Sequence, residues 1–254
     1  MRKFTLGLFV ALLFLMIKTS ACTCMGTTVV GYFQRSSFVA KVKFLKIVQD
    51  ASNPAYHNAE IEMITIYKGE QIKSIKIMSD LQSSCAFLPT ENSIWLIFAS
   101  VQHGEVTFGY CSGSLQIDKI FDPIKYPNGD QQFKSSFKLK LLTLDFLKKR
   151  HILDANPSKL VFFSPDISLI SGYKNGNRMA VFRADVNTDL SIGKIKALKE
   201  FKNRKLNQVY LGLLKKDLKI GKNQTLTKST QIIIFCYYYE SDKIEPSFIS
   251  YRSL

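Results

Sequence analysis

Four cysteines in the first half of the chain are the feature that most constrains its fold. Cys22 and Cys24 flank a single threonine directly after an apolar leader, and Cys85 and Cys111 follow at long intervals. In an exported chain such cysteines are disulfide candidates before they are metal ligands. Cys22 and Cys24 are too close in sequence to bridge each other easily. Two pairings therefore stay open: Cys22–Cys85 with Cys24–Cys111, or Cys22–Cys111 with Cys24–Cys85.

The leader itself is typical of an export signal. Arg2 and Lys3 precede the apolar run 6–17, and small residues at 19–21 form a cleavage site. The run is short for a membrane span. We therefore expect residues 1–21 to be a signal peptide, and the mature protein to begin at Cys22 in an extracellular or periplasmic compartment. Two alternatives remain: an uncleaved anchor, or lipidation of Cys22 in a bacterium, which would give an outer-surface lipoprotein.

The region from residue 37 to residue 111 has the alternating pattern of short strands. The apolar and β-branched stretches are 38–48, 59–69, 72–78, 93–99 and 105–111. Five short strands with polar turns predict a small barrel or sandwich. Apolar residues then recur every three or four positions between 133 and 153, which predicts an amphipathic helix.

A second, smaller unit is expected after the polar segment DANPSK at 154–159. The stretches 179–186, 191–198 and 230–241 are typical of strands, and 206–217 has helical spacing, giving the order ββαβ. The expected organisation is therefore a mainly β domain over 22–153 and a small α+β domain of unknown role over 154–254. Cys236, in the last strand, is expected to be a buried free thiol, or else a partner for another chain.

The excess of basic over acidic residues indicates which kinds of partner the protein could bind. The chain has 35 Lys and Arg against 20 Asp and Glu, a formal net charge of +15, and removal of the leader with its three basic residues leaves 15 − 3 = +12. This favours an anionic polymer, a membrane surface or an acidic protein, whereas export argues against nucleic acid. The basic residues cluster late, and form either a solvated face or a polyanion-binding patch. They are Lys148, Lys149, Arg150, Lys194, Lys196, Lys199, Lys202, Arg204, Lys205, Lys215 and Lys216.

The sequence contains no recognisable catalytic motif. It lacks His-Glu-x-x-His, a P-loop and Gly-x-Ser-x-Gly. His57, His103 and His151 have no second histidine at ligand spacing and are expected at the surface or in turns. We therefore expect no enzyme activity, no cofactor and no zinc of the protein's own. Asn223 begins a glycosylation sequon, which has meaning in a eukaryotic source.

The cysteines and strands together resemble a known family. Cys-Thr-Cys after the leader is followed by SSFVAKVKFLKI at 36–47, by SSCAFLPTENSIWLIFA at 83–99 and by CSGS at 111–114. This resembles the tissue inhibitors of metalloproteinases and the wider netrin-like module, over about residues 22–152. The resemblance implies a five-stranded OB-fold barrel with a flanking helix. It also implies the pairing Cys22–Cys85 with Cys24–Cys111.

The same resemblance implies a mechanism of inhibition. The α-amine and carbonyl of Cys22 would chelate the catalytic zinc of a target metalloproteinase, and Thr23 would enter its specificity pocket. Cys24, Met25, Ser83 and Ser84 would complete the inhibitory edge. Met25-Gly26 departs from the apolar residue and proline usual in the animal inhibitors. The alternative is a non-inhibitory netrin-like module that interacts with anionic partners in the cell envelope.

Overall fold

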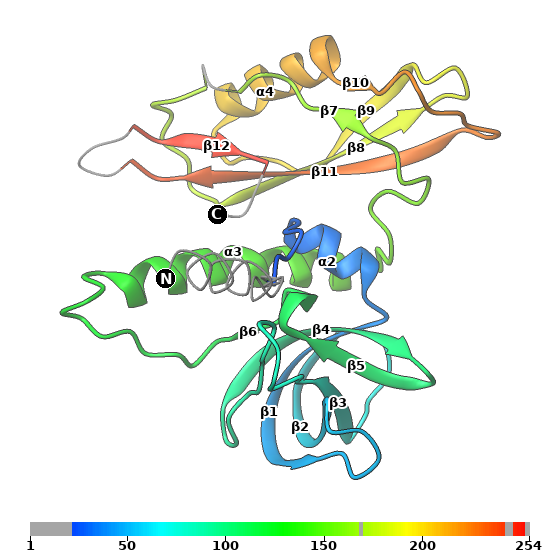
Figure 1. Ribbon diagram of the computed structural model, residues 1–254. Coiled ribbons are helices and arrows are strands. Elements are labelled where there is room, and N and C mark those ends of the chain that lie inside the picture. Colours follow the sequence, from blue (N-terminus) through cyan, green and yellow to red (C-terminus); the bar gives the residue numbers. More distant parts are fainter. Residues whose placement is uncertain (1–21, 168–169, 242–245, 252–254) are drawn as a thin grey trace, which may run out of the picture.

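The computed structural model describes residues 22–167, 170–241 and 246–251, and its elements form layers (Figure 1). A β-barrel lies at one end, two helices lie in the middle, and a four-stranded sheet covered by a further helix lies at the other end. This mainly β architecture with a smaller α+β part is the predicted fold class. Among the described residues, none of the helices combines the length and apolar character needed to span a bilayer.

The barrel is a closed ring of five strands. The strands are β1 (Phe38–Gln49), β2 (Tyr56–Lys68), β3 (Ser74–Met78), β4 (Ile94–Gln102) and β5 (Glu105–Gly109). They pair in the order β1-β2-β3-β5-β4, and a further pairing of β1 with β4 closes the ring. The β3–β5 pair is parallel and the others are antiparallel. This is the strand order of an OB-type barrel, and it confirms the predicted five strands.

The long first strand, β1, bends so that it pairs with β2 along one edge and with β4 along the other. Its register with β2 shifts at three places, and such bulges increase the local bend and twist of a strand. Phe44 of β1, Trp95 of β4 and Phe108 of β5 fill the barrel interior. Val39 of β1 points instead into a second cluster outside the barrel. Both faces of the strand's first half are therefore buried, which explains its continuous apolar sequence.

That second cluster joins the barrel to the rest of the chain. Helix α3 (Gly129–Lys149) buries Leu139, Leu144 and Leu147 in it, together with barrel residues and with residues of the far sheet such as Val181. The Thr143 hydroxyl lies 2.9 Å from the hydroxyl of Tyr237 in the far sheet, and both groups are buried. The apolar core is thus continuous across residue 153, where the sequence predicted a boundary. The helix itself starts at Gly129, earlier than the spacing of apolar residues indicates, and ends at Lys149.

The carboxyl-terminal part contains a sheet with the order β12-β11-β8-β9. Its strands are β8 (Met179–Val186), β9 (Ile192–Lys199), β11 (Thr230–Tyr239) and β12 (Phe248–Ser250). Helix α4 (Arg204–Asp217) packs on the face opposite α3, so β8, β9, α4 and β11 follow the predicted order. A two-stranded pair, β7 (Phe162–Phe163) with β10 (Lys219–Ile220), adjoins it. Cys236 is a free cysteine fully buried in this core, as predicted.

Candidate functional site

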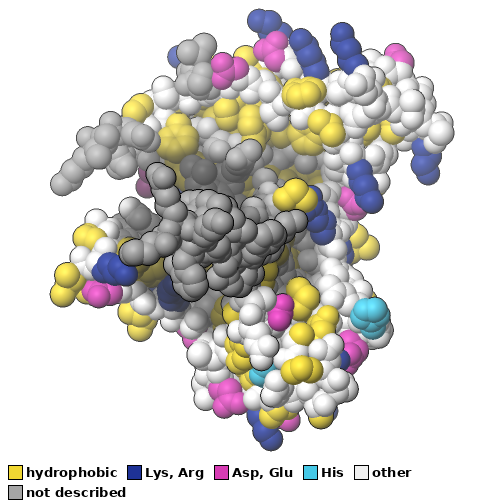
Figure 2. Space-filling model, viewed as in Figure 1, with side chains coloured by type: hydrophobic (Ala, Val, Ile, Leu, Met, Phe, Trp, Pro, Cys, Tyr) yellow, Lys and Arg dark blue, Asp and Glu magenta, His cyan; other side chains and the backbone are white. Residues whose placement is uncertain are grey.

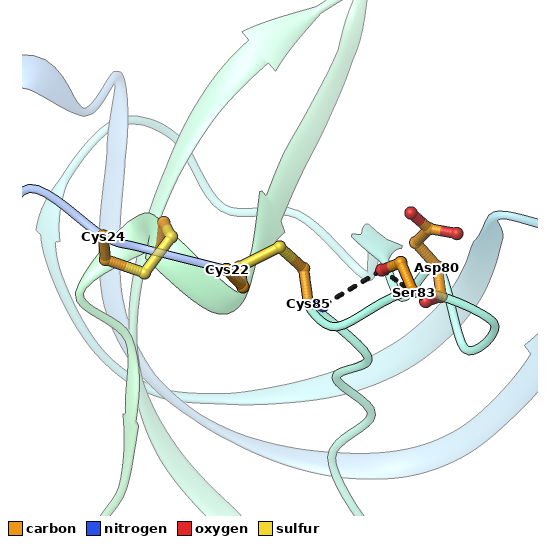
Figure 3. The surroundings of a disulfide bond; sticks show 6 residues. Cys22, Cys24, Asp80, Ser83 and Cys85 are labelled. Carbon is orange, nitrogen blue, oxygen red and sulfur yellow. Dashed lines mark hydrogen bonds between the residues drawn. A yellow bond between two sulfur atoms is a disulfide. The ribbon is translucent and has the colours of Figure 1, made fainter. Parts of the chain in front are cut away.

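Two disulfides fasten residues 22–24 to the end of the barrel. Cys22 is bonded to Cys85 and Cys24 to Cys111, which is the pairing implied by the family resemblance (Figure 3). The Cα atoms are 5.1 and 5.2 Å apart, within the usual range. The sulfur atoms of Cys22, Cys24 and Cys111 all lie within 4.8 Å of one another. Since each belongs to a disulfide, this group holds no free thiolate with which to bind a metal.

A short helix holds the other end of this segment. Residues 22–28 have no regular secondary structure, and helix α2 (Val29–Arg35) follows, with the Thr28 hydroxyl accepting a hydrogen bond from the Gly31 amide at 3.2 Å. Val29 and Phe33 are buried in the cluster shared with α3. The segment is therefore held at both ends, by the disulfides and by the buried face of α2.

The η1 turn (Tyr110–Ser112), which carries Cys111, is packed closely against α2. Gly113 follows the turn with φ +82°, and a Cβ atom there would lie 2.5 Å from the ring of Tyr32 in α2. Both the backbone angle and the close approach require glycine. Tyr32 also contacts Phe98 of β4, with ring centroids 5.6 Å apart. The Cys24–Cys111 bond thus links the segment that leads into α2 to a turn that packs on α2.

The loop that carries Cys85 is hydrogen-bonded internally. The Ser83 hydroxyl donates to the Asp80 carbonyl at 2.9 Å and accepts from the Cys85 amide at 3.1 Å. Phe87 then anchors the loop to the barrel, because its ring packs on Trp95 at 5.5 Å and on Phe108 at 5.8 Å. Cys85 is consequently presented by a rigid loop.

The start of this loop depends on a histidine that the sequence analysis placed at the surface. His57 is instead buried, and its Nδ1 lies 2.8 Å from the Ser79 hydroxyl. That hydroxyl donates to the Ala55 carbonyl at 3.0 Å, so the histidine nitrogen is the donor to it. The expectation for His57 was wrong because an alternating strand places every second residue inside the barrel. His103 and His151 are exposed and have positive φ, as expected of turn residues.

The predicted edge residues form one surface. Thr23 is exposed between the two disulfides, Met25 is 85% exposed, and Ser84 is exposed on the facing loop. The Cys22–Cys85 bond brings the segment 22–25 and the loop 83–85 together. All six residues named from the sequence, Cys22, Thr23, Cys24, Met25, Ser83 and Ser84, therefore lie at one end of the barrel.

A surface hollow beside Met25 had no signal in the sequence. Its volume is about 270 Å³, and its lining includes Met25, Arg35, Met78, Phe108 and Ser112. These residues come from four stretches of the chain, since Phe108 and Ser112 are close in sequence, and only the folded barrel brings the four together. The hollow adds a partly apolar concavity next to the exposed threonine.

No protein-family model matches the chain, and a search of curated proteins finds no match. The two disulfides indicate folding in an oxidising compartment such as the extracellular space. The function is therefore argued below from the geometry of this surface.

Proposed function

We propose that the mature protein is a secreted inhibitor of zinc metalloproteinases that resembles the tissue inhibitors of metalloproteinases. It acts through the α-amine and carbonyl of Cys22 after the leader is removed. The observation that carries the proposal is the Cys22-Thr23-Cys24 segment, which exposes Thr23 between two half-buried cysteines and is fixed by two disulfides at one end of an OB-type barrel.

The chemistry of a catalytic zinc site suits such a ligand. The metal has three protein ligands and an open position that holds water. The amino nitrogen and carbonyl oxygen of an N-terminal residue form a five-membered chelate ring with a metal and so displace that water. The amine must be neutral to donate its electron pair, and an α-amino pKa of roughly 7.7 allows this near neutral pH.

Rigidity supports binding at this end of the molecule. The two disulfides and α2 already order residues 22–28, so little conformational entropy is lost on docking. The exposed Thr23 side chain is available to enter the enzyme's specificity pocket. Met25 with its neighbouring hollow, and Ser83 with Ser84 on the facing loop, would contact the enzyme on either side.

One added residue at the amino terminus tests the proposal. Inhibition of a panel of zinc metalloproteinases is measured for the protein that begins at Cys22 and for the same protein preceded by one alanine. The extension keeps both disulfides but turns the amine into an amide, which does not bind zinc. We expect affinity to fall at least about 100-fold, the effect of losing a central contact in an interface.

A second variant tests the position of Thr23. Thr23→Arg is expected to abolish inhibition of enzymes with small pockets, whereas Thr227→Arg, at another exposed threonine, leaves it unchanged. Equal inhibition by the extended and native proteins would refute chelation. An acyl group on the Cys22 amine would refute it too, because the acylated nitrogen is no longer a ligand.

The outward face of α4 supports a second function, the binding of an anionic polymer. Arg204, Lys205, Lys215 and Lys216 are exposed on this helix, and its first turn contains no acidic residue to offset them. None of these four cations is paired with a carboxylate of a described residue. Unpaired cations in a first helical turn are unfavourable for the helix dipole, so an external anion would stabilise them.

Heparin-column retention tests this second function. Arg204→Gln/Lys205→Gln, in the first turn of α4, should elute at lower salt than the wild-type protein, and Lys43→Gln/Lys46→Gln on the barrel should elute with the wild type. Equal shifts for both pairs would indicate general charge attraction and would contradict a site on α4.

A further inference from the structure

The connection between β6 (Leu115–Gln116) and α3 exposes apolar side chains to an unusual degree. Ile120 is 83% exposed, Ile124 is 91% exposed and Tyr126 is 49% exposed. Single exposed apolar residues are common, but three within seven positions form a patch. The connection projects from the molecule (Figure 1), and Figure 2 shows hydrophobic, basic and acidic side chains together at this end. We call residues 118–128 the apolar loop.

Hydrogen bonds give the apolar loop a fixed conformation. The Asp122 carboxylate accepts from the amides of Ile124 at 2.8 Å and Lys125 at 3.3 Å, and the Asp130 carboxylate accepts from the amide of Phe121 at 2.9 Å. The Tyr126 amide donates to the Asp122 carbonyl at 2.8 Å. The bonds to Asp122 are those of an Asx turn within a single helical turn, and the bond to Asp130 ties the loop to the start of α3. The isoleucines are thus displayed on an ordered backbone.

Aromatic packing supports the loop from beneath. The ring of Phe121 lies 6.0 Å from that of Tyr126 and 5.6 Å from that of Phe133 in α3. Gly129 allows this approach, because a Cβ atom there would lie 3.0 Å from the Cβ of Tyr126 and 3.2 Å from that of Phe121. The loop therefore half-buries Phe121 and leaves the isoleucines outside.

Two lysines lie beside the apolar tips. The Nζ of Lys119 is 5.1 Å from the centre of the Phe121 ring, and the Nζ of Lys125 is 5.5 Å from that of Tyr126. The loop's acids Asp118 and Asp122 accept backbone amides, and Asp130 at its base does the same. The loop thus offers apolar tips with two lysines beside them. Its two lysines and two aspartates balance, and the positive charge that favours an anionic surface is that of the whole chain, whose formal net charge is +15.

We propose that the apolar loop docks the protein onto a lipid bilayer with anionic headgroups. Ile120 and Ile124 would enter the boundary between headgroups and acyl chains, Tyr126 would lie at the headgroup level, and Lys119 and Lys125 would contact lipid phosphates or carboxylates. This combination of aliphatic, aromatic and basic side chains is typical of interfacial membrane binding. The proposal does not depend on metalloproteinase inhibition.

Vesicle co-sedimentation tests this proposal. The full chain, with its intact mass checked for an acyl group, is mixed with vesicles of phosphatidylcholine alone or with added phosphatidylserine. Ile120→Ser/Ile124→Ser is the test variant, and Val101→Ser/Leu153→Ser is the control, since those side chains are exposed elsewhere at 57% and 68%. Equal melting temperatures establish that both variants are folded.

We expect the wild type and the control to bind vesicles that contain phosphatidylserine. The isoleucine variant should bind them at least about tenfold more weakly, from the apolar area that it no longer buries. Lys119→Ala/Lys125→Ala should weaken only the part of binding that salt suppresses. Absence of vesicle binding, or equal binding by the isoleucine variant, would overturn the proposal. Self-association that the isoleucine variant abolishes, without vesicle binding, would instead identify a second copy of the chain as the occupant.

Discussion

Removal of either disulfide is expected to cost almost the same stability, although the two close loops of different length. The bonded residues are 63 positions apart for Cys22–Cys85 and 87 for Cys24–Cys111. Taken alone, loops of these lengths would stabilise the fold by about 4.3 and about 4.6 kcal/mol through the entropy of the unfolded chain. Each bond, however, acts in the presence of the other.

With one disulfide intact, the other closes a much smaller ring. The ring contains the 2 positions from Cys22 to Cys24 and the 26 from Cys85 to Cys111, about 28 in all. The chain-entropy relation gives about 3.6 kcal/mol for such a ring, whichever bond is removed. Removal of both bonds should cost about 8 kcal/mol, the sum of one full loop and one small ring.

Urea unfolding of Cys22→Ser/Cys85→Ser, of Cys24→Ser/Cys111→Ser and of the fourfold variant measures these costs. Cys22, Cys24 and Cys85 are half-buried and Cys111 is exposed, so replacement by serine leaves no buried cavity. The first variant also retains the amine and carbonyl of residue 22, and should still lose inhibition because its terminus is no longer ordered. A loss below about 1 kcal/mol for either single bond would refute the reasoning, because unfolded-chain entropy could not then be the main effect.

Two further perturbations follow from the fold. Leu144→Ala should lower the free energy of unfolding by about 2–5 kcal/mol, because Leu144 is buried in the core shared by the barrel and the far sheet. Fluorescence of Trp95 in the barrel and far-UV circular dichroism should report the same single unfolding transition. Two separate transitions would contradict the shared core. Hydrogen bonds from Ser52 and then from Lys76 hold the pKa of Asp50 well below its usual value. The ionised Asp50 therefore stabilises the folded state at any pH above its unfolded pKa of about 3.9, and this stabilisation is lost as the pH falls below that value. Asp50→Asn should therefore make thermal stability less sensitive to acid below about pH 4, and an unchanged pH profile would contradict this ion pair.

The barrel was predictable from the sequence because its strands either alternate apolar and polar residues or are continuously apolar, and polar turns separate them. The disulfide pairing was not: two arrangements satisfied the spacing, and only the resemblance chose between them. The edge residues came from the same resemblance, and the Cys22–Cys85 bond is what brings the loop of Ser83 and Ser84 to residue 22.

Other features had weak signals. Helix α2 has seven residues, with two β-branched valines and a glycine, and its helical state depends on packing rather than propensity. The continuous core has a signal in α3, where Phe137, Leu141, Leu142 and Phe146 widen the apolar stripe beyond one face. Such a stripe is typical of a helix buried on two sides. The ion pairs of Lys76 with Asp50 and Glu105 join residues distant in sequence, so no local pattern could predict them.

Coordination of zinc by the Cys22 amine is the central claim, and a cobalt-substituted target enzyme tests it most directly. The visible absorption of cobalt(II) in the catalytic site reports a change of ligands. If the amine and carbonyl of Cys22 replace the bound water, the spectrum should change when the native protein is added and stay unchanged with the alanine-extended protein. Inhibition without a spectral change, or the same change with the extended protein, would contradict the claim.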